Sequence, residues 1–419
     1  MKKKLSILIA ALLVCVLVVT MLSGTIFGAA RRPSSFKLGI LLPYTGTFAA
    51  VAKTQQQGIL LAVDQKNAEG GLNMPWGKVK IEYEDMDDEA NINTGVRRFR
   101  YLRDQGAHAV VGQTWAAVAL AINELTIRDP FPYFPVNVAP LDSYRKGKMG
   151  EATYAAGYTP WTVGYMAGAA AINDLGKKRI FYLGRSDSWG WDIKAGLERA
   201  VAQYGGEIIG ATEVAQGTSD FTTVLEQVRA AKPDVFISAQ FGGDAISLLK
   251  QCYDMGLNKE MTIFNSFLTN VVAEGLPVEA RENVYGMHFF YYDLTGFEDA
   301  ETAKLAADYS KAFMDKWGTP PDAYATIAYI AVQQLFDAVE RAGSFDQAEI
   351  RKTIGQNPEF MSVKGPAYWR EDHEAIYDYA GFLVRGKGPK EAKNKFDYFE
   401  VISVQGGEEV YPKLKDLGF

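Results

Sequence analysis

The chain has 419 residues, which is long for one compact core and sufficient for two domains. Its composition, 48% hydrophobic and 22% charged, is ordinary for a folded protein and excludes long disordered stretches. The formal net charge of −6 gives no electrostatic support to nucleic-acid binding, so no nucleic acid is expected among the partners. Cys15 lies in the N-terminal apolar run and leaves Cys252 alone in the body of the chain, which excludes an intrachain disulfide there.

The first 30 residues have the layout of a secretory signal peptide. A cationic start, Met1 to Lys4, precedes an uncharged apolar run from Leu5 to Leu22, and small residues follow up to Ala30. Cleavage after Ala30 would release an extracytoplasmic or periplasmic protein. The apolar run is also long enough to cross a bilayer, so an uncleaved anchor stays open as an alternative. A lipoprotein site at Cys15 is disfavoured, because no small residue precedes this cysteine and the apolar run continues past it.

The body of the chain alternates short apolar runs with longer amphipathic ones. The first set predicts strands at 37–42, 79–84, 109–112 and 133–138, with helices at 47–67, 93–105 and 116–126. A second set begins near Thr159. It predicts strands at 179–183, 207–213, 234–238 and 261–265, with helices at 161–175, 191–204, 221–231 and 243–255.

Strands that alternate with helices predict parallel sheets with right-handed crossovers, and the two successive sets predict two α/β lobes. Ligands of such sheets bind beyond the carboxyl ends of the strands. The predicted ligand loops are therefore those that follow Leu42, Gly112, Val138, Leu183, Ser238 and Asn265.

Motifs of common enzyme classes do not occur in the sequence. It has no G-x-x-x-x-G-K-[ST] phosphate loop, no dinucleotide-binding G-x-G-x-x-G after a strand, and no G-x-S-x-G nucleophile elbow. The three histidines are far apart and have no metal-ligand spacing. We therefore expect a protein that is not an enzyme and that needs no cofactor or metal.

Several segments in order along the chain resemble the type I periplasmic binding proteins, and most closely the branched-chain amino acid and amide binding proteins of ATP-driven (ABC) importers. They are the segment Gly39-Ile40-Leu41-Leu42-Pro43-Tyr44-Thr45-Gly46, the helix end 62–72, the acidic strand 83–88, Ala109-Val110-Val111-Gly112, Ser219-Asp220-Phe221-Thr222 and Gly365-Pro366-Ala367-Tyr368-Trp369. No single motif is decisive, but their order covers nearly the whole chain after the leader.

The resemblance implies two Rossmann-like lobes, joined by a hinge of three crossings, that close over a small molecule. On the family's pattern, lobe 1 would comprise residues 36–155 and 289–361, and lobe 2 residues 156–288 and 362–419. The resemblance also implies that the closed form docks on the permease of a membrane importer, and we expect a monomer. A membrane-anchored ligand sensor of the same fold is the alternative that an uncleaved leader would favour.

The family's clamp for the α-carboxylate and α-ammonium groups of an amino acid matches only in part. Its carboxylate-binding Ser corresponds here to Ala116, its Thr corresponds to Val138, and its acidic residue falls near Ser266 or Phe267. Burying an ammonium ion without a carboxylate partner is costly. A standard amino acid is therefore disfavoured as the ligand.

Aromatic residues replace the clamp on the same matching. Trp189 and Phe241 stand where the family has cleft tyrosines, and Trp115 and Phe267 add two more rings. Arg185 is a candidate partner for a ligand carboxylate, and a salt bridge within the protein is the alternative. The neutral polar candidates are Tyr44, Thr45, Gln113, Asn137 and Asn265. These residues predict a planar acid or amide as the ligand.

Overall fold

The structure is a computed structural model that describes residues 32–136 and 141–419. The predicted leader and its cleavage site, together with Asn137 and Val138, lie outside the described residues. Within them, no helix is long and apolar enough to cross a membrane.

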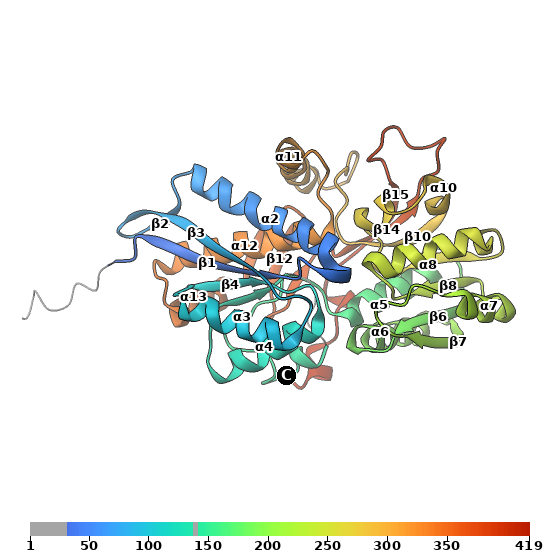
Figure 1. The fold of residues 1–419 in the computed structure, drawn as a ribbon, viewed down its shortest axis with the longest axis horizontal. Coiled ribbons are helices and arrows are strands. Elements are labelled where there is room, and N and C mark those ends of the chain that lie inside the picture. Colours follow the sequence, from blue (N-terminus) through green and yellow to red (C-terminus); the bar gives the residue numbers. More distant parts are fainter. Residues whose placement is uncertain (1–31, 137–140) are drawn as a thin grey trace, which may run out of the picture.

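Two sheets organise the chain (Figure 1). The first sheet has the strand order β2-β3-β1-β4-β5, and its pairs are parallel except β2 with β3. Its strands are β1 (Ser35–Leu42), β2 (Leu72–Met74), β3 (Gly77–Asp87), β4 (Ala109–Gly112) and β5 (Tyr133–Pro135). Every residue of β1 except Lys37 is buried, as expected of a central parallel strand that is covered on both faces.

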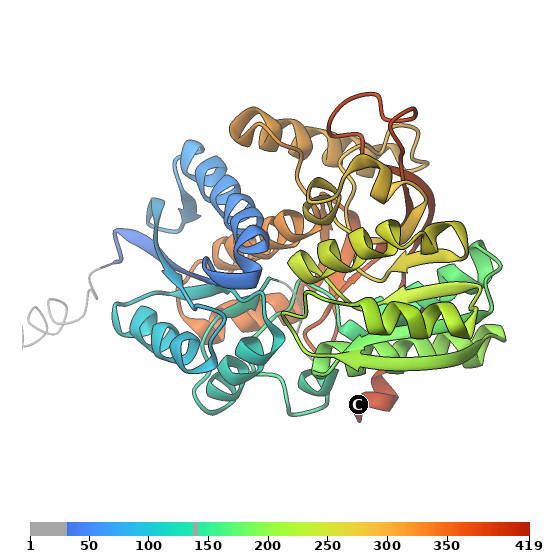
Figure 2. The same cartoon turned by 45° about the vertical axis from the view of Figure 1, so that its right-hand side comes forward.

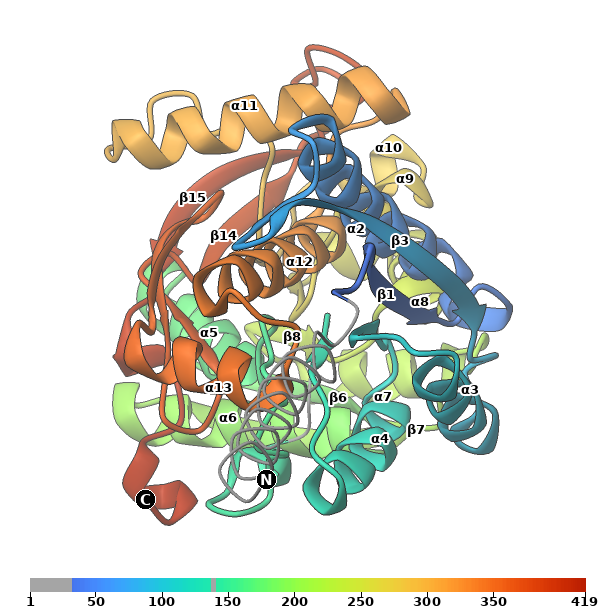
Figure 3. The ribbon, with the colours of Figure 1, turned by 90° about the vertical axis from the view of Figure 1, so that its left-hand side faces the viewer.

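Helices cover both faces of the first sheet. They are α2 (Ala49–Ala68), α3 (Ile92–Asp104), α4 (Ala116–Arg128), α12 (Ala323–Ala342) and α13 (Gln347–Gln356). Figure 3 shows α2 and α12 side by side. Gly58 permits this close approach, because a Cβ at this position would lie 2.0 Å from the carbonyl oxygen of Ala325. We call these strands and helices the first-sheet unit.

The second sheet has the order β15-β14-β10-β9-β8-β6-β7. Its parallel strands are β6 (Arg179–Arg185), β7 (Glu207–Val214), β8 (Val235–Ser238), β9 (Thr262–Asn265) and β10 (Val284–His288). The strands β14 (Gly381–Gly386) and β15 (Phe399–Gln405) add an antiparallel edge that the sequence analysis did not predict.

The helices of the second sheet precede or connect its strands. They are α5 (Pro160–Ala169), α6 (Ser188–Tyr204), α7 (Thr222–Ala231), α8 (Gly242–Asp254), α9 (Asn270–Glu274) and α10 (Val278–Arg281). The helices α5 and α6 pack against each other, and α8 lies on the opposite face of the sheet (Figures 1 and 2). These helices with their seven-stranded sheet form the second-sheet unit.

The chain passes three times between the two units. The first passage joins β5 to α5. The second joins β10 to α12 and contains α11 (Ala300–Trp317). The third runs from α13 to β14 through a small antiparallel sheet of β11 (Glu359–Ser362), β12 (Gly365–Trp369) and β13 (Ala375–Tyr377). The predicted fold class, two α/β units with parallel central strands joined by three crossings, is confirmed.

Candidate functional site

The carboxyl ends of the central strands of both sheets bring three predicted polar residues and Gln240, which was not predicted, to the region between the units. Gln113 follows β4, Arg185 ends β6, Gln240 follows β8 and Asn265 ends β9. Each of the four is at most 1% exposed. This is the edge at which open α/β sheets bind ligands.

Three of the predicted aromatic residues form one cluster in the second-sheet unit. The ring of Trp189 lies 5.2 Å from that of Phe241 and 5.9 Å from that of Phe267, both in edge-to-face geometry. None of the three side chains is more than 5% exposed. Edge-to-face packing suits the quadrupoles of aromatic rings and creates a rigid apolar wall.

The helix predicted at 191–204 begins earlier than predicted, so Trp189 lies in this helix and not in the loop after β6. Helix α6 begins at Ser188, with Asp187 as its N-cap accepting a hydrogen bond from the Gly190 N–H, so Trp189 lies in the first helical turn. Its indole Nε1 donates to the Ala239 carbonyl at 2.6 Å. The hydrogen bond holds the ring in the aromatic cluster.

Two further aromatic residues of the cluster come from the first-sheet unit and were not predicted. Phe48 precedes α2 and stacks on Phe241 at 5.4 Å with an interplanar angle of 11°. Tyr324, in the first turn of α12, lies 5.2 Å from Phe267. Both are 1% exposed. These contacts join the two units across the aromatic cluster.

Polar contacts also join the connecting passages to the second-sheet unit. The Leu141 N–H donates to Oδ2 of Asp192 on α6 at 2.8 Å, and Nδ2 of Asn270 on α9 donates to the Pro321 carbonyl at 3.1 Å. Burial raises the pKa of Asp192 to about 6. The units are therefore in contact on several sides of the cluster, in a closed arrangement.

Arg185 is a buried cation beside the aromatic cluster. Its guanidinium carbon lies 4.9 Å from the ring centre of Phe241. Its Nη2 donates to Asp187 at 2.6 Å and to Gln216 at 2.8 Å, whereas its Nε has no partner. The internal salt bridge that the sequence left open is thus present, and one N–H remains free for an acceptor.

Several other buried polar atoms at this edge have no partner among the described residues. The acceptors are Gln113 Oε1, Gln240 Oε1 and Asn265 Oδ1, and one donor is Gln55 Nε2. Unpaired buried polar atoms are rare in folded proteins and are commonly satisfied by a ligand or water. With Arg185 Nε, the edge offers both donors and acceptors to a small polar group.

The remaining candidates from the first-sheet unit occupy different places. Ala116 begins α4 and is 4% exposed, and Trp115 before it is half-buried and packs against the core. Thr45 is exposed. The hydroxyl of Tyr44 donates to Asp85 on β3. Burial and Asp85 raise the pKa of this hydroxyl.

One buried acid near the contact between the units was not predicted. Asp322 caps α12 by accepting from the Ala325 N–H at 2.9 Å, and its Oδ2 has no hydrogen-bond partner. Burial raises its pKa to about 6. Its neighbours include Thr54 of α2 and Glu274 of α9, so it lies where helices of both units meet. A capping residue before α12 was the signal that could have found it.

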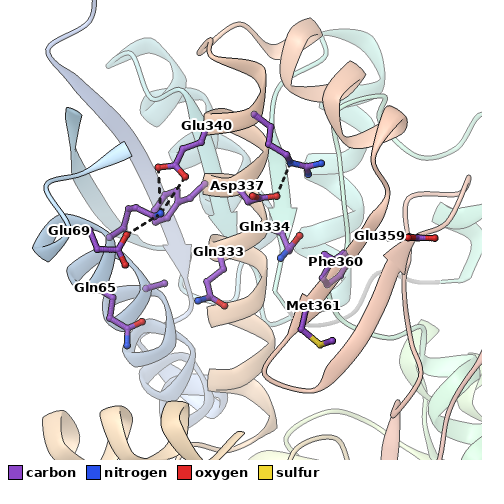
Figure 4. A pocket seen from close by; sticks show the side chains of 13 residues that line it. Gln65, Glu69, Gln333, Gln334, Asp337, Glu340, Glu359, Phe360 and Met361 are labelled. Carbon is purple, nitrogen blue, oxygen red and sulfur yellow. Dashed lines mark hydrogen bonds and ion pairs between the residues drawn. The ribbon is translucent and has the colours of Figure 1, made fainter. Parts of the chain in front are cut away.

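A separate cavity of about 500 Å³ lies on the helical side of the first-sheet unit, between α2, α12 and β11 (Figure 4). Its charged walls pair with one another: Lys66 with Glu69 and Glu340, and Arg341 with Asp337. None of the predicted site residues lines it. In the described part of the chain no group of His, Cys, Asp and Glu could hold a metal ion.

The chain matches the family model described as periplasmic binding protein over residues 35–389. A relative, the Leu/Ile/Val-binding protein homolog 1 of Brucella abortus (strain 2308), is 23% identical over 365 residues, which are 87% of this chain and 93% of the relative.

Two solved structures have the same fold. An amino acid ABC transporter substrate-binding protein from Pseudomonas fluorescens Pf-5 superposes with a TM-score of 0.80 at 23% identity, covering 92% of this chain and 99% of that chain. An ABC transporter solute-binding protein from R. palustris in complex with benzoate superposes with a TM-score of 0.75 at 21% identity, covering 88% and 96%.

Proposed function

The chain belongs to the periplasmic binding protein family, and we propose that it is the extracytoplasmic substrate-binding component of an ABC importer of the branched-chain amino acid and amide type. The similar proteins support this role, because their names place them among Leu/Ile/Val-binding proteins and ABC transporter substrate-binding proteins. The permease of the importer is then its membrane partner, and the ligand is a small solute.

We propose that the ligand is a planar organic acid or amide bound between the two units. The observation that carries this proposal is the buried aromatic cluster of Trp189, Phe241 and Phe267 beside Arg185. Flat apolar walls favour a planar ring, and the free Arg185 Nε–H favours a carboxylate or carbonyl acceptor. A solute-binding protein of the same fold holds benzoate, which fits this ligand class.

A ligand that carries an ammonium group is the competing candidate, and Asp322 favours it. Its Oδ2 has no hydrogen-bond partner and could accept from an amine. Asp322 would then replace the family's acidic residue, which is missing in this chain. Against this, Asp322 already serves as the N-cap of α12, where its carboxylate accepts from the backbone N–H groups of Ala325 and Tyr324, and this structural role accounts for its burial. We therefore retain the planar acid or amide.

We propose hinge closure as the mechanism, with residues 36–155 and 289–361 as lobe 1 and residues 156–288 and 362–419 as lobe 2. A ligand that contacts both lobes stabilises the closed state by its differential affinity for that state. The stack of Phe48 on Phe241 supports this mechanism, since its two rings come from opposite lobes.

Thermal-shift titration tests the proposed ligand class. We expect benzoate and benzamide to raise Tm with increasing concentration and leucine to leave it unchanged, because a ligand stabilises only the state that binds it. Stabilisation by leucine and not by the aromatic compounds would overturn the proposal.

Export in mature form is the remaining part of the proposal. The leader composition supports cleavage after Ala30, and the apolar run from Leu5 to Leu22 favours a membrane-anchored sensor if it is retained. Mass spectrometry of the protein purified from its native host decides between them. An N-terminus at Arg31 supports the transport protein, and an intact leader supports the sensor.

A further inference from the structure

Lys364 lies in the third passage between the units, in the turn that joins β11 to β12. It is 2% exposed, although lysine is among the residues least often buried. Among the described residues it forms no ion pair with an acid. Its ammonium nitrogen instead lies 4.8 Å from the ring centres of both Tyr158 and Tyr377.

The three hydrogen bonds of Lys364 reach all three passages. Its Nζ donates to the Phe289 carbonyl at 2.6 Å, in the second passage, and to the Ala380 carbonyl at 2.7 Å, where the third passage enters β14. The third partner is the hydroxyl of Tyr158, in the first passage just before α5. One side chain thus ties together all the segments that connect the two units.

This arrangement is complete in either protonation state of the lysine. An ammonium ion has three N–H donors for three acceptors. A neutral amine keeps two donors for the carbonyls, and its lone pair accepts from the Tyr158 hydroxyl. Burial lowers the pKa of Lys364 well below its usual value, and the groups that face it, Tyr158, Tyr377 and His288, carry no negative charge to offset this effect.

One residue that hydrogen-bonds to Lys364 also contacts the aromatic cluster. The ring of Phe289, whose carbonyl accepts from Lys364, stacks on Phe267 at 4.7 Å and lies 4.4 Å from Tyr158. Moving the second passage would therefore move the residue that supports Phe267. Conversely, rotation of one unit against the other would withdraw at least one acceptor and leave a buried donor unpaired.

We propose that Lys364 is a positioning residue of the hinge, which favours the closed arrangement of the two units by hydrogen-bonding to all three connecting segments. This inference rests on the proposed hinge closure and deepens it, because it names the side chain that biases the equilibrium.

Distance measurement between two spin labels tests the inference on the unliganded full chain. Asn93 on α3 and Thr223 on α7 are exposed and belong to opposite units, so cysteines at these positions report the separation. The background replaces Cys15 and Cys252 by alanine. In K364M we expect the distance distribution to shift toward longer values, because methionine retains the apolar stem and loses all three hydrogen bonds.

Y158F removes only one partner and should shift the distribution in the same direction by a smaller amount. K352M is the matched control, since Lys352 is exposed on α13 and pairs only with Glu349; its distribution should equal that of the wild type. If K364M does not fold, the distance distribution of Y158F tests the role of Lys364 instead. A distribution unchanged in K364M, or unchanged in Y158F when K364M does not fold, would overturn the role of Lys364. Failure of the proposed function is a separate result, because it would show as no rise in the Tm of the wild type with benzoate or benzamide in the thermal-shift titration.

Discussion

Replacing Arg185 by methionine tests the proposed recognition of an acid. The variant R185M keeps an apolar stem over Phe241 but loses the buried N–H that has no protein partner. A hydrogen bond to a charged group contributes about 1.5–3 kcal/mol, which corresponds to a roughly 10- to 150-fold loss of affinity for benzoate. Benzamide, a neutral compound of the same shape, should lose less affinity than benzoate, because its hydrogen bond to the guanidinium is charge-assisted on one side only.

Isothermal titration calorimetry of both ligands measures this difference. R179M is the matched control, because Arg179 begins the same strand at the opposite end, is exposed, and bonds the Lys232 carbonyl. It should leave both affinities unchanged. R185M also removes the ion-pair partner of Asp187, so the Tm of R185M is measured in parallel. Equal losses for benzoate and benzamide, or no loss for benzoate, would refute the role given to Arg185.

Three further predictions concern the contacts between the units and one buried histidine. F48L should weaken ligand affinity about 2- to 12-fold by calorimetry, because the stack of Phe48 on Phe241 contributes about 0.5–1.5 kcal/mol. The control F36L alters a ring that packs inside the first-sheet unit, and it should leave ligand affinity unchanged. Burial raises the pKa of Asp192 to about 6, and we expect opening to expose this carboxyl, so affinity should fall as pH rises from about 4 to 6, and D192N should abolish this slope. Burial lowers the pKa of His288 to about 3, so the unfolded chain binds its proton first and this group should lower stability by roughly 3 kcal/mol from pH 7 to pH 4. The fall measured by denaturant titration should be smaller by about this amount in H288Q, where His108 and His373, whose pKa values burial also lowers, keep their own contributions. A pH slope of affinity retained in D192N, or a fall in stability in H288Q equal to that of the wild type, would contradict the corresponding assignment.

Most of the fold could be predicted because its signals are local. A central parallel strand such as β1 reads as a continuous apolar run, and the amphipathic helices between the strands carry their own period. The antiparallel edge of β14 and β15 was missed. These strands come after the alternation of strands and helices has ended, and their pairing with β10 joins residues far apart in sequence.

The candidate site was predictable only where it follows a strand. The rule for carboxyl ends found Arg185 and Gln113, and the matching of family positions found Trp189, Phe241 and Phe267. These five residues are all buried at the edge where the units meet.

The rule for the carboxyl ends of strands could not predict site residues that come from the N-termini of helices. Phe48 and Tyr324 reach the cluster from α2 and α12, because the two units come together in space. Tyr44 stays a prediction, and the sequence could not show that its hydroxyl donates to Asp85, which is two strands away in sequence but adjacent in the sheet. Asn137 and Val138 stay predictions, since they lie outside the described residues.

Native mass spectrometry of the protein purified from its own host, with identification of the released small molecule, tests the central claim most directly. The buried aromatic cluster and the free Arg185 Nε–H predict a planar carboxylate or amide that is lost in R185M. Release of leucine, isoleucine or valine, retained in R185M, would contradict it.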